Sequence, residues 1–193
     1  MGAAANGRAF PLAVDGLALD CYGRGMAILP ILTYPDARLR RPCLPAAGAT
    51  DDVRALAQDM LETMYDAGGR GLAAPQIGVL LRVFVMDVTW KEGAPDTYVC
   101  INPSILDASE EVSTFTEGCL SIPHVPAEVT RPAEITLQWT DLSGETRIER
   151  LSGIAATCAQ HELDHLNGRL CIDLMSEAAR VAASPALTQL GVS

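Results

Sequence analysis

Apolar and polar residues follow a helical period between residues 50 and 68. Apolar side chains recur there every three or four positions, the spacing that gathers them on one face of a helix. Thr50 or Asp51 can cap the first turn, and the acidic residues at its start suit the helix dipole. Gly68 and Gly69 supply a stop signal. The pattern predicts one amphipathic helix whose buried face comprises Val53, Leu56, Met60, Leu61 and Met64.

Five shorter segments carry strand patterns. Residues 81–88 and 98–102 are short apolar runs of the kind found in buried strands. Residues 112–116 and 134–140 instead alternate apolar and polar side chains with a period of two. A Ser-Gly turn signal precedes the fifth strand, which is expected near 146–151.

A second helix is expected from Ser152, which can cap it, to a stop signal at Asn167 and Gly168. Strands on either side of a few helices indicate an α+β fold. The residues of this second helix that should face the core are Ala155, Cys158, Ala159, Leu163 and Leu166.

Composition narrows the class of protein. A length of 193 residues suits one domain, and an apolar share of 49% is enough to bury a sizeable core. No apolar run approaches the ~18 residues of a membrane span, and the first 25 residues lack the apolar core of a secretory signal.

The net charge of −10 disfavours nucleic acid or an anionic membrane as a partner. Six scattered cysteines fit a reducing cytosol, so we expect a cytoplasmic protein.

The candidate chemistry is concentrated in residues 161–165, which read His-Glu-Leu-Asp-His. On a helix, His161 and His165 lie one turn apart, so both imidazoles project from one face and can hold one metal ion. Glu162 can take a proton from a water molecule at that metal. The alternative is a pair of exposed helical histidines. It is weakened because the chain has only three histidines and two of them fall in the motif.

A third ligand is expected from an upstream segment, because no histidine follows His165. Cys119 is the candidate, within the sequence Glu-Gly-Cys-Leu-Ser at 117–121. Three protein ligands leave a fourth position open, which is typical of a catalytic metal site. Cysteine and histidine together suit a borderline metal such as zinc or ferrous iron.

The sequence resembles the peptide deformylase family in three motifs. They read Gly-Arg-Gly-Leu-Ala-Ala-Pro-Gln at 69–76, Glu-Gly-Cys-Leu-Ser at 117–121 and His-Glu-Leu-Asp-His at 161–165, in the family's order and at about its spacing. The resemblance implies mixed or antiparallel β-sheets packed around a central metal-binding helix. It also implies a catalytic domain over residues 26–175, with a disordered extension at 1–25 and a short C-terminal tail at 176–193.

The resemblance further implies a metal-dependent hydrolase. Such an enzyme removes the N-formyl group from the N-terminal formyl-methionine of newly made polypeptides and releases formate. Ferrous iron is the implied native metal, with zinc, nickel or cobalt able to occupy the site. The resemblance assigns oxyanion stabilisation to the Gln76 side chain and the backbone N–H of Leu120. It assigns Glu117 and Arg131 to a structural ion pair.

Substrate binding is implied for two segments. Gly69, Arg70 and Gly71 would pair with the substrate peptide as an added strand, since the glycines permit close backbone approach. The methionine pocket would be lined in part by Ile154, Thr157 and Cys158.

Three features depart from the family pattern. Arg70 stands where the family usually has an apolar residue, and its side chain is expected at the mouth of the cleft. There it could contact an acidic or polar substrate position or partly block the groove. Thr157 is more polar than a methionine pocket would suggest. Residues 174–193 contain only Arg180 as a base, so we expect no ribosome docking through a basic C-terminal helix.

Two rival functions stay open on the sequence. A non-catalytic peptide-binding relative is suggested by Arg70 and the atypical tail, although every residue needed for chemistry is retained. An ordinary zinc endopeptidase is supported only by the His-Glu-x-x-His motif, and the cysteine ligand argues against it. A monomer is the default expectation for the oligomeric state.

Overall fold

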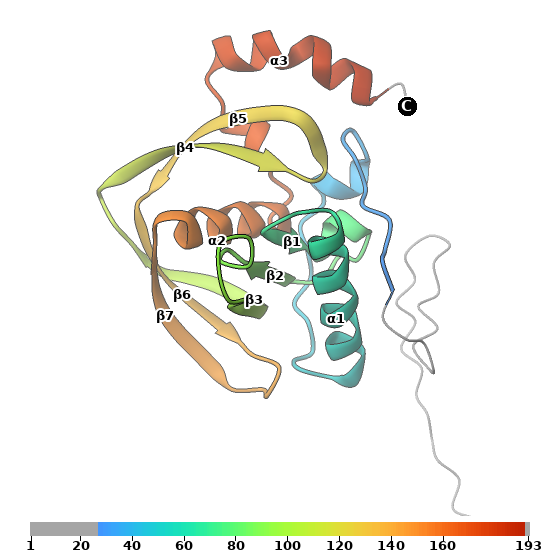
Figure 1. Ribbon diagram of the computed structural model, residues 1–193, viewed down its shortest axis with the longest axis vertical. Coiled ribbons are helices and arrows are strands. Elements are labelled where there is room, and N and C mark those ends of the chain that lie inside the picture. Colours follow the sequence, from blue (N-terminus) through green and yellow to red (C-terminus); the bar gives the residue numbers. More distant parts are fainter. Residues whose placement is uncertain (1–26, 192–193) are drawn as a thin grey trace, which may run out of the picture.

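The computed structural model describes residues 27–191 (Figure 1). The extension expected at 1–25 therefore lies outside the described residues. The helices are α1 (Asp51–Asp66), α2 (Gly153–Leu166) and α3 (Glu177–Leu190). The strands are β1 (Gly71–Ala73), β2 (Val83–Asp87), β3 (Thr97–Ala108), β4 (Val112–Cys119), β5 (Ile122–Pro132), β6 (Glu134–Thr140) and β7 (Thr146–Ser152).

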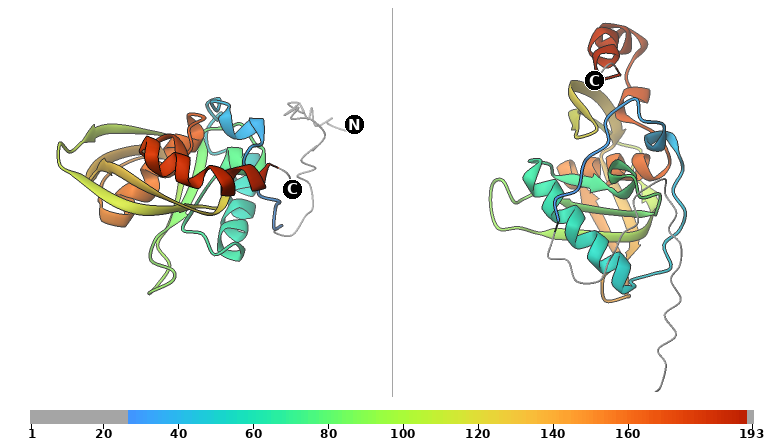
Figure 2. Two further views of the ribbon diagram at one scale, coloured as in Figure 1. Left: turned by 90° about the horizontal axis from the view of Figure 1, so that it is seen from above. Right: turned by 90° about the vertical axis from the view of Figure 1, so that its right-hand side faces the viewer.

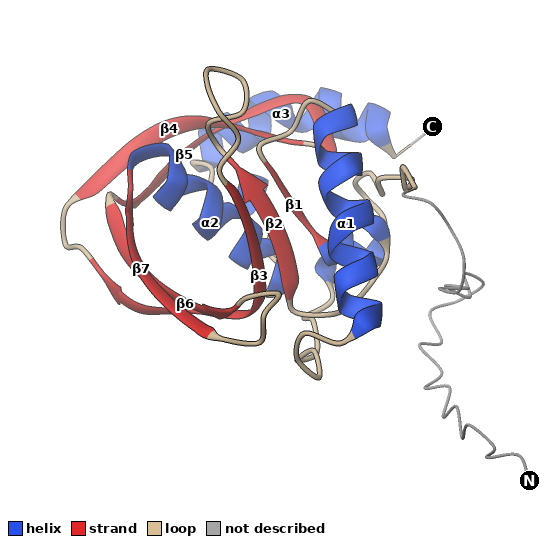
Figure 3. Ribbon diagram, turned by 60° about the horizontal axis from the view of Figure 1, so that its bottom comes forward, coloured by secondary structure: helices blue, strands red, loops and turns tan. Residues whose placement is uncertain are grey.

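The strands form two antiparallel sheets around helix α2. The larger sheet has the order β1-β2-β3-β6-β7, and the smaller one is the β4–β5 hairpin. Helix α2 lies between the two sheets, while α1 covers β1 and β2 from the outside (Figure 3). The predicted α+β fold, with antiparallel sheets around a central helix, is confirmed.

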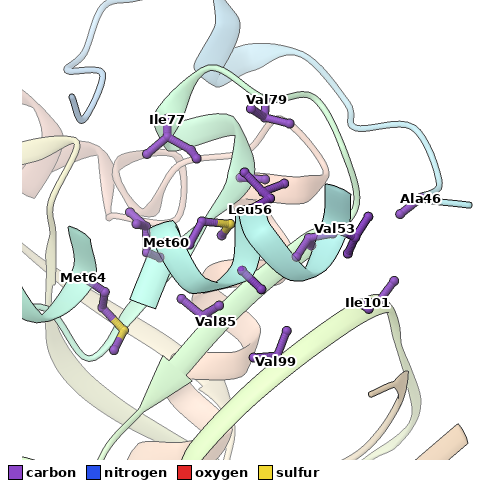
Figure 4. Close-up of a cluster of buried hydrophobic side chains, with 14 residues drawn as sticks. Ala46, Val53, Leu56, Met60, Met64, Ile77, Val79, Val85, Val99 and Ile101 are labelled. Atoms are coloured by element: carbon purple, nitrogen blue, oxygen red, sulfur yellow. The ribbon is translucent and has the colours of Figure 1, made fainter. Parts of the chain in front are cut away.

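Helix α1 forms where the sequence predicts it. The Thr50 hydroxyl accepts a hydrogen bond from the Val53 N–H, and Gly68 leaves the helix at a φ of +67°. The apolar face of α1 packs against β1, β2 and β3 in a dense cluster (Figure 4). This cluster fixes the sheet edge at β1, which continues from the segment expected to bind substrate at residues 69–71. Its fully buried members include Ala57, Met60, Met64, Leu72, Val83 and Val85.

Strand β5 is the main element that the sequence pattern does not predict. Its inward-facing residues alternate regularly from Val125 to Arg131. Prolines at 123, 126 and 132 mask that alternation, because proline is a strand breaker in most contexts. His124, with a φ of +65°, also interrupts the period between Ile122 and Val125. The short strand β1 was also not predicted, while β2, β3, β4, β6 and β7 lie where they were expected, although β3 and β4 extend further.

Helix α3 occupies most of the region expected as a short C-terminal tail. Ser176 caps it by accepting a hydrogen bond from the Ala179 N–H. Leu187 is buried against the β4–β5 hairpin, across which α3 lies on the side away from α2 (Figure 2). Pro185 within the helix explains why the pattern gave no helix signal. Across residues 27–191, no helix has the length and apolarity needed to cross a bilayer.

Candidate metal centre and substrate cavity

Cys119, His161 and His165 meet between α2 and the end of β4. One donor atom from each lies within 4.8 Å of the others, and Cys119 Sγ is 3.3 Å from His165 Nε2. All three side chains are buried. The helical spacing places the two imidazole centroids 5.0 Å apart, one turn from each other. The structure therefore brings the three predicted ligands together, with a geometry that can hold one cation.

The donor set fits a borderline divalent metal. A thiolate and two imidazoles are the ligands that zinc and ferrous iron accept, and three of them leave a coordination position open. Glu162 Oε2 and His165 Nδ1 are buried without a hydrogen-bond partner in the described part of the chain. Buried polar atoms are rarely left unpaired, so Glu162 Oε2 points to water or a cation as a further partner, whereas His165 Nδ1 is not the ring nitrogen that faces Cys119.

Protonation in the metal-free protein opposes metal binding. The neighbouring Cys171 thiol and burial raise the pKa of Cys119 well above its usual value. Burial works to lower the pKa of His161, but the bond to Glu117 and the nearby negative groups Glu162 and Cys171 together outweigh burial and raise that pKa to about 9. Burial lowers the pKa of His165, so this imidazole is neutral. A bound metal must therefore displace protons from Cys119 and His161.

A buried ion-pair network supports the ligands from behind. Glu117 Oε2 lies 2.8 Å from His161 Nδ1, which directs the other ring nitrogen towards the metal position. Arg131 Nε donates to Glu117 Oε1 at 2.6 Å, and Arg131 Nη1 donates to Asp164 Oδ2 at 2.7 Å. The expected pair of Glu117 and Arg131 is present in the structure. Asp164, for which the sequence suggested no role, extends the pair into a network.

Glu162 lies beside the metal position and lines the cavity. Burial raises the pKa of its carboxyl group to about 7. A carboxylate with a pKa near neutrality can both accept and return a proton. A Cβ added to Gly71 would lie 2.3 Å from Glu162 Oε1, so the backbone of β1 is in direct contact with this carboxylate.

The predicted oxyanion donors flank Cys119. Gln76 Oε1 accepts a hydrogen bond from the Ala73 N–H at 2.8 Å, which fixes the orientation of the amide. Gln76 Nε2 then points to Ser121 Oγ at 3.1 Å and lies 3.9 Å from Cys119 Sγ. Leu120 and Ser121 form the tight connection between β4 and β5. Ser121 was not identified from the sequence, because only the fold brings it to Gln76.

A cavity of about 630 Å³ opens onto the metal position. It has the size of a small-ligand pocket. Its lining includes all six residues expected to bind substrate: Gly69, Arg70, Gly71, Ile154, Thr157 and Cys158. The Thr157 hydroxyl donates to the Gly153 carbonyl oxygen at 3.1 Å. Its polarity is thereby satisfied within the helix, which removes the conflict with an apolar pocket.

Arg70 is held at the rim of the cavity. Its guanidinium donates to the Val88 carbonyl oxygen and to both carboxylate oxygens of Glu92. These bonds direct the side chain towards the β2–β3 loop, and a quarter of it is exposed. Arg70 therefore does not block the groove. The loop partners were missed in the sequence, since no local pattern links residues 88–92 to the Gly-Arg-Gly segment.

Comparison with known proteins identifies one family. A family model described as Polypeptide deformylase matches residues 28–181. A peptide deformylase of Afipia carboxidovorans is 52% identical over 155 residues, covering 80% of this chain and 91% of that protein. One from Rhizobium meliloti is 50% identical over 155 residues, covering 80% of this chain and 89% of that protein.

Solved structures agree with the sequence relatives. A crystal structure of a peptide deformylase from Legionella pneumophila is 39% identical, covers 86% of this chain and 96% of its own, and gives a TM-score of 0.79. A peptide deformylase structure from Ehrlichia chaffeensis in complex with actinonin is 38% identical. The match covers 85% of this chain and 96% of that chain, with a TM-score of 0.79.

Proposed function

Because this chain belongs to the polypeptide deformylase family, we propose that the residues at the metal centre carry out that family's reaction. The protein is a metal-dependent hydrolase that removes the N-formyl group from formyl-methionine at the start of new polypeptides. The main support for the residue assignment is that donor atoms of Cys119, His161 and His165 lie close together, with Glu162 beside them.

Glu162 is the proposed general base and acid. A divalent cation held by Cys119, His161 and His165 would polarise the formyl carbonyl and lower the pKa of nearby water. The Glu162 carboxylate takes a proton from the attacking water and delivers it to the departing amine nitrogen. Burial and a pKa of about 7 support this double role. Formate and the free amino terminus are the products.

Gln76 and Leu120 are the proposed donors to the oxyanion. The Gln76 amide is already oriented by the Ala73 N–H, so it needs no rearrangement when negative charge develops. Leu120 would contribute its backbone N–H from the tight turn after Cys119. Each such donor stabilises a transition state by ~3 kcal/mol.

The substrate peptide is proposed to lie along the Gly69–Gly71 segment as an added strand. The methionine side chain would enter the part of the cavity formed by Thr157 and Cys158, with Ile154 at its exposed rim. Glu117 and Arg131 are proposed as structural support for His161, which they reach through the buried network.

Several finer assignments are also proposals. Ferrous iron is the proposed native metal on the basis of the family resemblance, and the thiolate and imidazole donors would also accept zinc, nickel or cobalt. The proposed partners are N-formyl-methionyl nascent peptides, with no nucleic acid, no membrane and a monomeric state. Contact with the ribosome would not use a basic C-terminal helix. A cytoplasmic location is supported by the free, buried thiols of Cys43, Cys100 and Cys171.

Formate release from a formyl-Met tripeptide tests the proposal directly. Protein would be reconstituted anaerobically with ferrous iron, and wild type compared with Glu162→Gln. We expect turnover to fall about 10²- to 10⁴-fold in the variant while one metal per chain is retained. Glu128→Gln, an exposed change on β5, is the matched control and should leave turnover unchanged. A metal-loaded wild type that binds the peptide but releases no formate would favour the binding-only relative.

A further inference from the structure

The loop between β2 and β3 contacts the substrate-binding segment through polar groups. Trp90 Nε1 donates to the Gly69 carbonyl oxygen at 2.8 Å, and Lys91 Nζ donates to the Gly68 carbonyl oxygen. Arg70 reaches back to the loop through Val88 and Glu92. Asp87 fixes the start of the loop by accepting hydrogen bonds from the N–H groups of Thr89 and Trp90. The loop is therefore an ordered wall of the groove.

Lys91 is the cationic group of this wall that has no carboxylate partner. Its side chain lines the same cavity as the metal ligands and lies 5.3 Å from the centroid of the Trp90 ring. Within residues 27–191, no carboxylate lies within ion-pair distance of Lys91, whereas Arg70 is neutralised by Glu92. Lys91 is also the only lysine in the sequence. A chain with a net charge of −10 thus carries at the mouth of its cavity one lysine without an ion-pair partner among residues 27–191, because the adjacent Glu92 bonds to Arg70 instead.

The position of Lys91 places it near the part of the substrate peptide that follows the methionine. Gly71 contacts Glu162, which marks the reacting end of the groove, and Gly68 contacts Lys91. Three residues of backbone separate these two points, at most roughly 10 Å in extended form. A peptide paired with this segment advances by a similar length over three residues. The Lys91 ammonium therefore lies beside one of the two residues that follow the substrate methionine.

We propose that Lys91 is a specificity-determining residue that favours substrates with an acidic side chain at one of the two positions after formyl-methionine. The proposal rests on the proposed function and adds a substrate class to it. The interaction is electrostatic and solvent-exposed, so its effect on catalytic efficiency is modest and falls with salt. Glu92 limits the preference, because it neutralises the second cation, Arg70.

Competing tripeptides test this inference at low ionic strength. The substrates are formyl-Met-Asp-Ala and formyl-Met-Ala-Asp, each with its alanine and lysine counterparts. For one of the two series, we expect kcat/KM for aspartate to exceed that for alanine by about two- to fivefold, with lysine lowest. The preference should disappear in Lys91→Gln and persist in Lys91→Arg. It should shrink in 0.5 M salt, where the Debye length falls to about 4 Å.

Two further variants sharpen the result. Glu92→Gln frees Arg70 and should increase the preference for aspartate, which is opposite to the effect of Lys91→Gln. Arg180→Gln removes one exposed charge on α3, outside the cavity, and should change nothing. Equal kcat/KM for aspartate and lysine substrates in wild type, or a preference that survives Lys91→Gln, would overturn the inference. Failure to process formyl-Met-Ala-Ala at all would instead overturn the proposed function.

Discussion

At the scale of single residues, the metal centre requires a residue without a side chain at position 71. Gly71 sits where β1 meets Glu162, and a Cβ there would lie 2.3 Å from Glu162 Oε1 and 2.8 Å from Cys158 Sγ. Its φ is not in the left-handed region, so alanine is tolerated by the backbone but not by its neighbours. The glycine therefore sets the distance between strand β1, the proposed substrate-binding strand, and the proposed base.

Gly71→Ala should lower kcat/KM by more than about tenfold while the protein stays folded, because a misplacement near 1 Å at the reacting groups is costly. Steady-state kinetics with a formyl-Met peptide, together with circular dichroism, would measure both effects. Gly93→Ala serves as the control, since a Cβ there meets only ordinary contacts. Equal activity of the two variants would show that Glu162 can move away from a Cβ at position 71 without loss of activity.

Metal binding should release protons near pH 7. The pKa of His161 is raised to about 9 and that of Cys119 is raised above its usual value, so both groups are protonated in the metal-free protein. Their displacement by zinc predicts release of about two protons per chain. Calorimetry in buffers of different ionisation enthalpy would count them. Cys119→Ser should release about one fewer, and a titration without proton release would contradict this account.

At the scale of elements, Arg131 connects β5 with β4 and α2. It bonds Glu117 on β4 and Asp164 on α2, and all three side chains are largely shielded from water. A buried charge network of this kind is sensitive to the loss of one partner, because the remaining charges stay desolvated. The Arg131 guanidinium thus fixes the position of the β4–β5 hairpin relative to helix α2.

Arg131→Met should destabilise the protein by about 3–5 kcal/mol, since it leaves two buried carboxylates without their cation. Denaturant unfolding of the metal-loaded protein would measure the change. Arg150→Met removes an exposed pair with Glu134 and should cost less than about 1 kcal/mol. Similar losses in the two variants would mean that the buried network contributes little.

The sequence predicts the elements whose periodicity is regular. Helix α1, helix α2 and strand β6 appear where apolar spacing places them, although the Ser152 side chain makes no capping hydrogen bond to α2. Strand β5 is missed because its prolines and the positive φ of His124 break the alternation. Helix α3 is missed because Pro185 lies inside it and its stability comes from packing on the hairpin.

At the site, residues that belong to one local motif could be predicted from the sequence, whereas contacts between distant segments could not. The His-Glu-x-x-His spacing fixes two ligands and Glu162 without any tertiary information, because they share one helix. The roles of Asp164 and Ser121, and the contacts of Arg70 and Lys91 with neighbouring segments, depend on elements far apart in the chain. No pattern within a window of a few residues could have revealed them.

At the scale of the whole molecule, the metal position joins the two sheets through α2 and the end of β4. A cation bound there stabilises the folded state alone, because the three ligands are not close together in the unfolded chain. Removing the metal with a chelator should therefore lower Tm by about 10 °C for a domain of this size. Calorimetric scans before and after chelation, with zinc added back, would show it. An unchanged Tm would mean that the metal does not bind at this position or binds the unfolded chain equally well.

Helix α2 buries six polar side chains, namely Thr157, Gln160, His161, Glu162, Asp164 and His165. Burying such groups is unfavourable until each has a partner. Strands β4 and β5, which supply Cys119, Glu117 and Arg131, precede α2 in the chain and so leave the ribosome first. We therefore expect the cation to bind after these elements have folded. A molecule that loses its metal would unfold more often and meet proteases more often, so metal supply would govern how much of this protein a cell keeps as well as how fast it works.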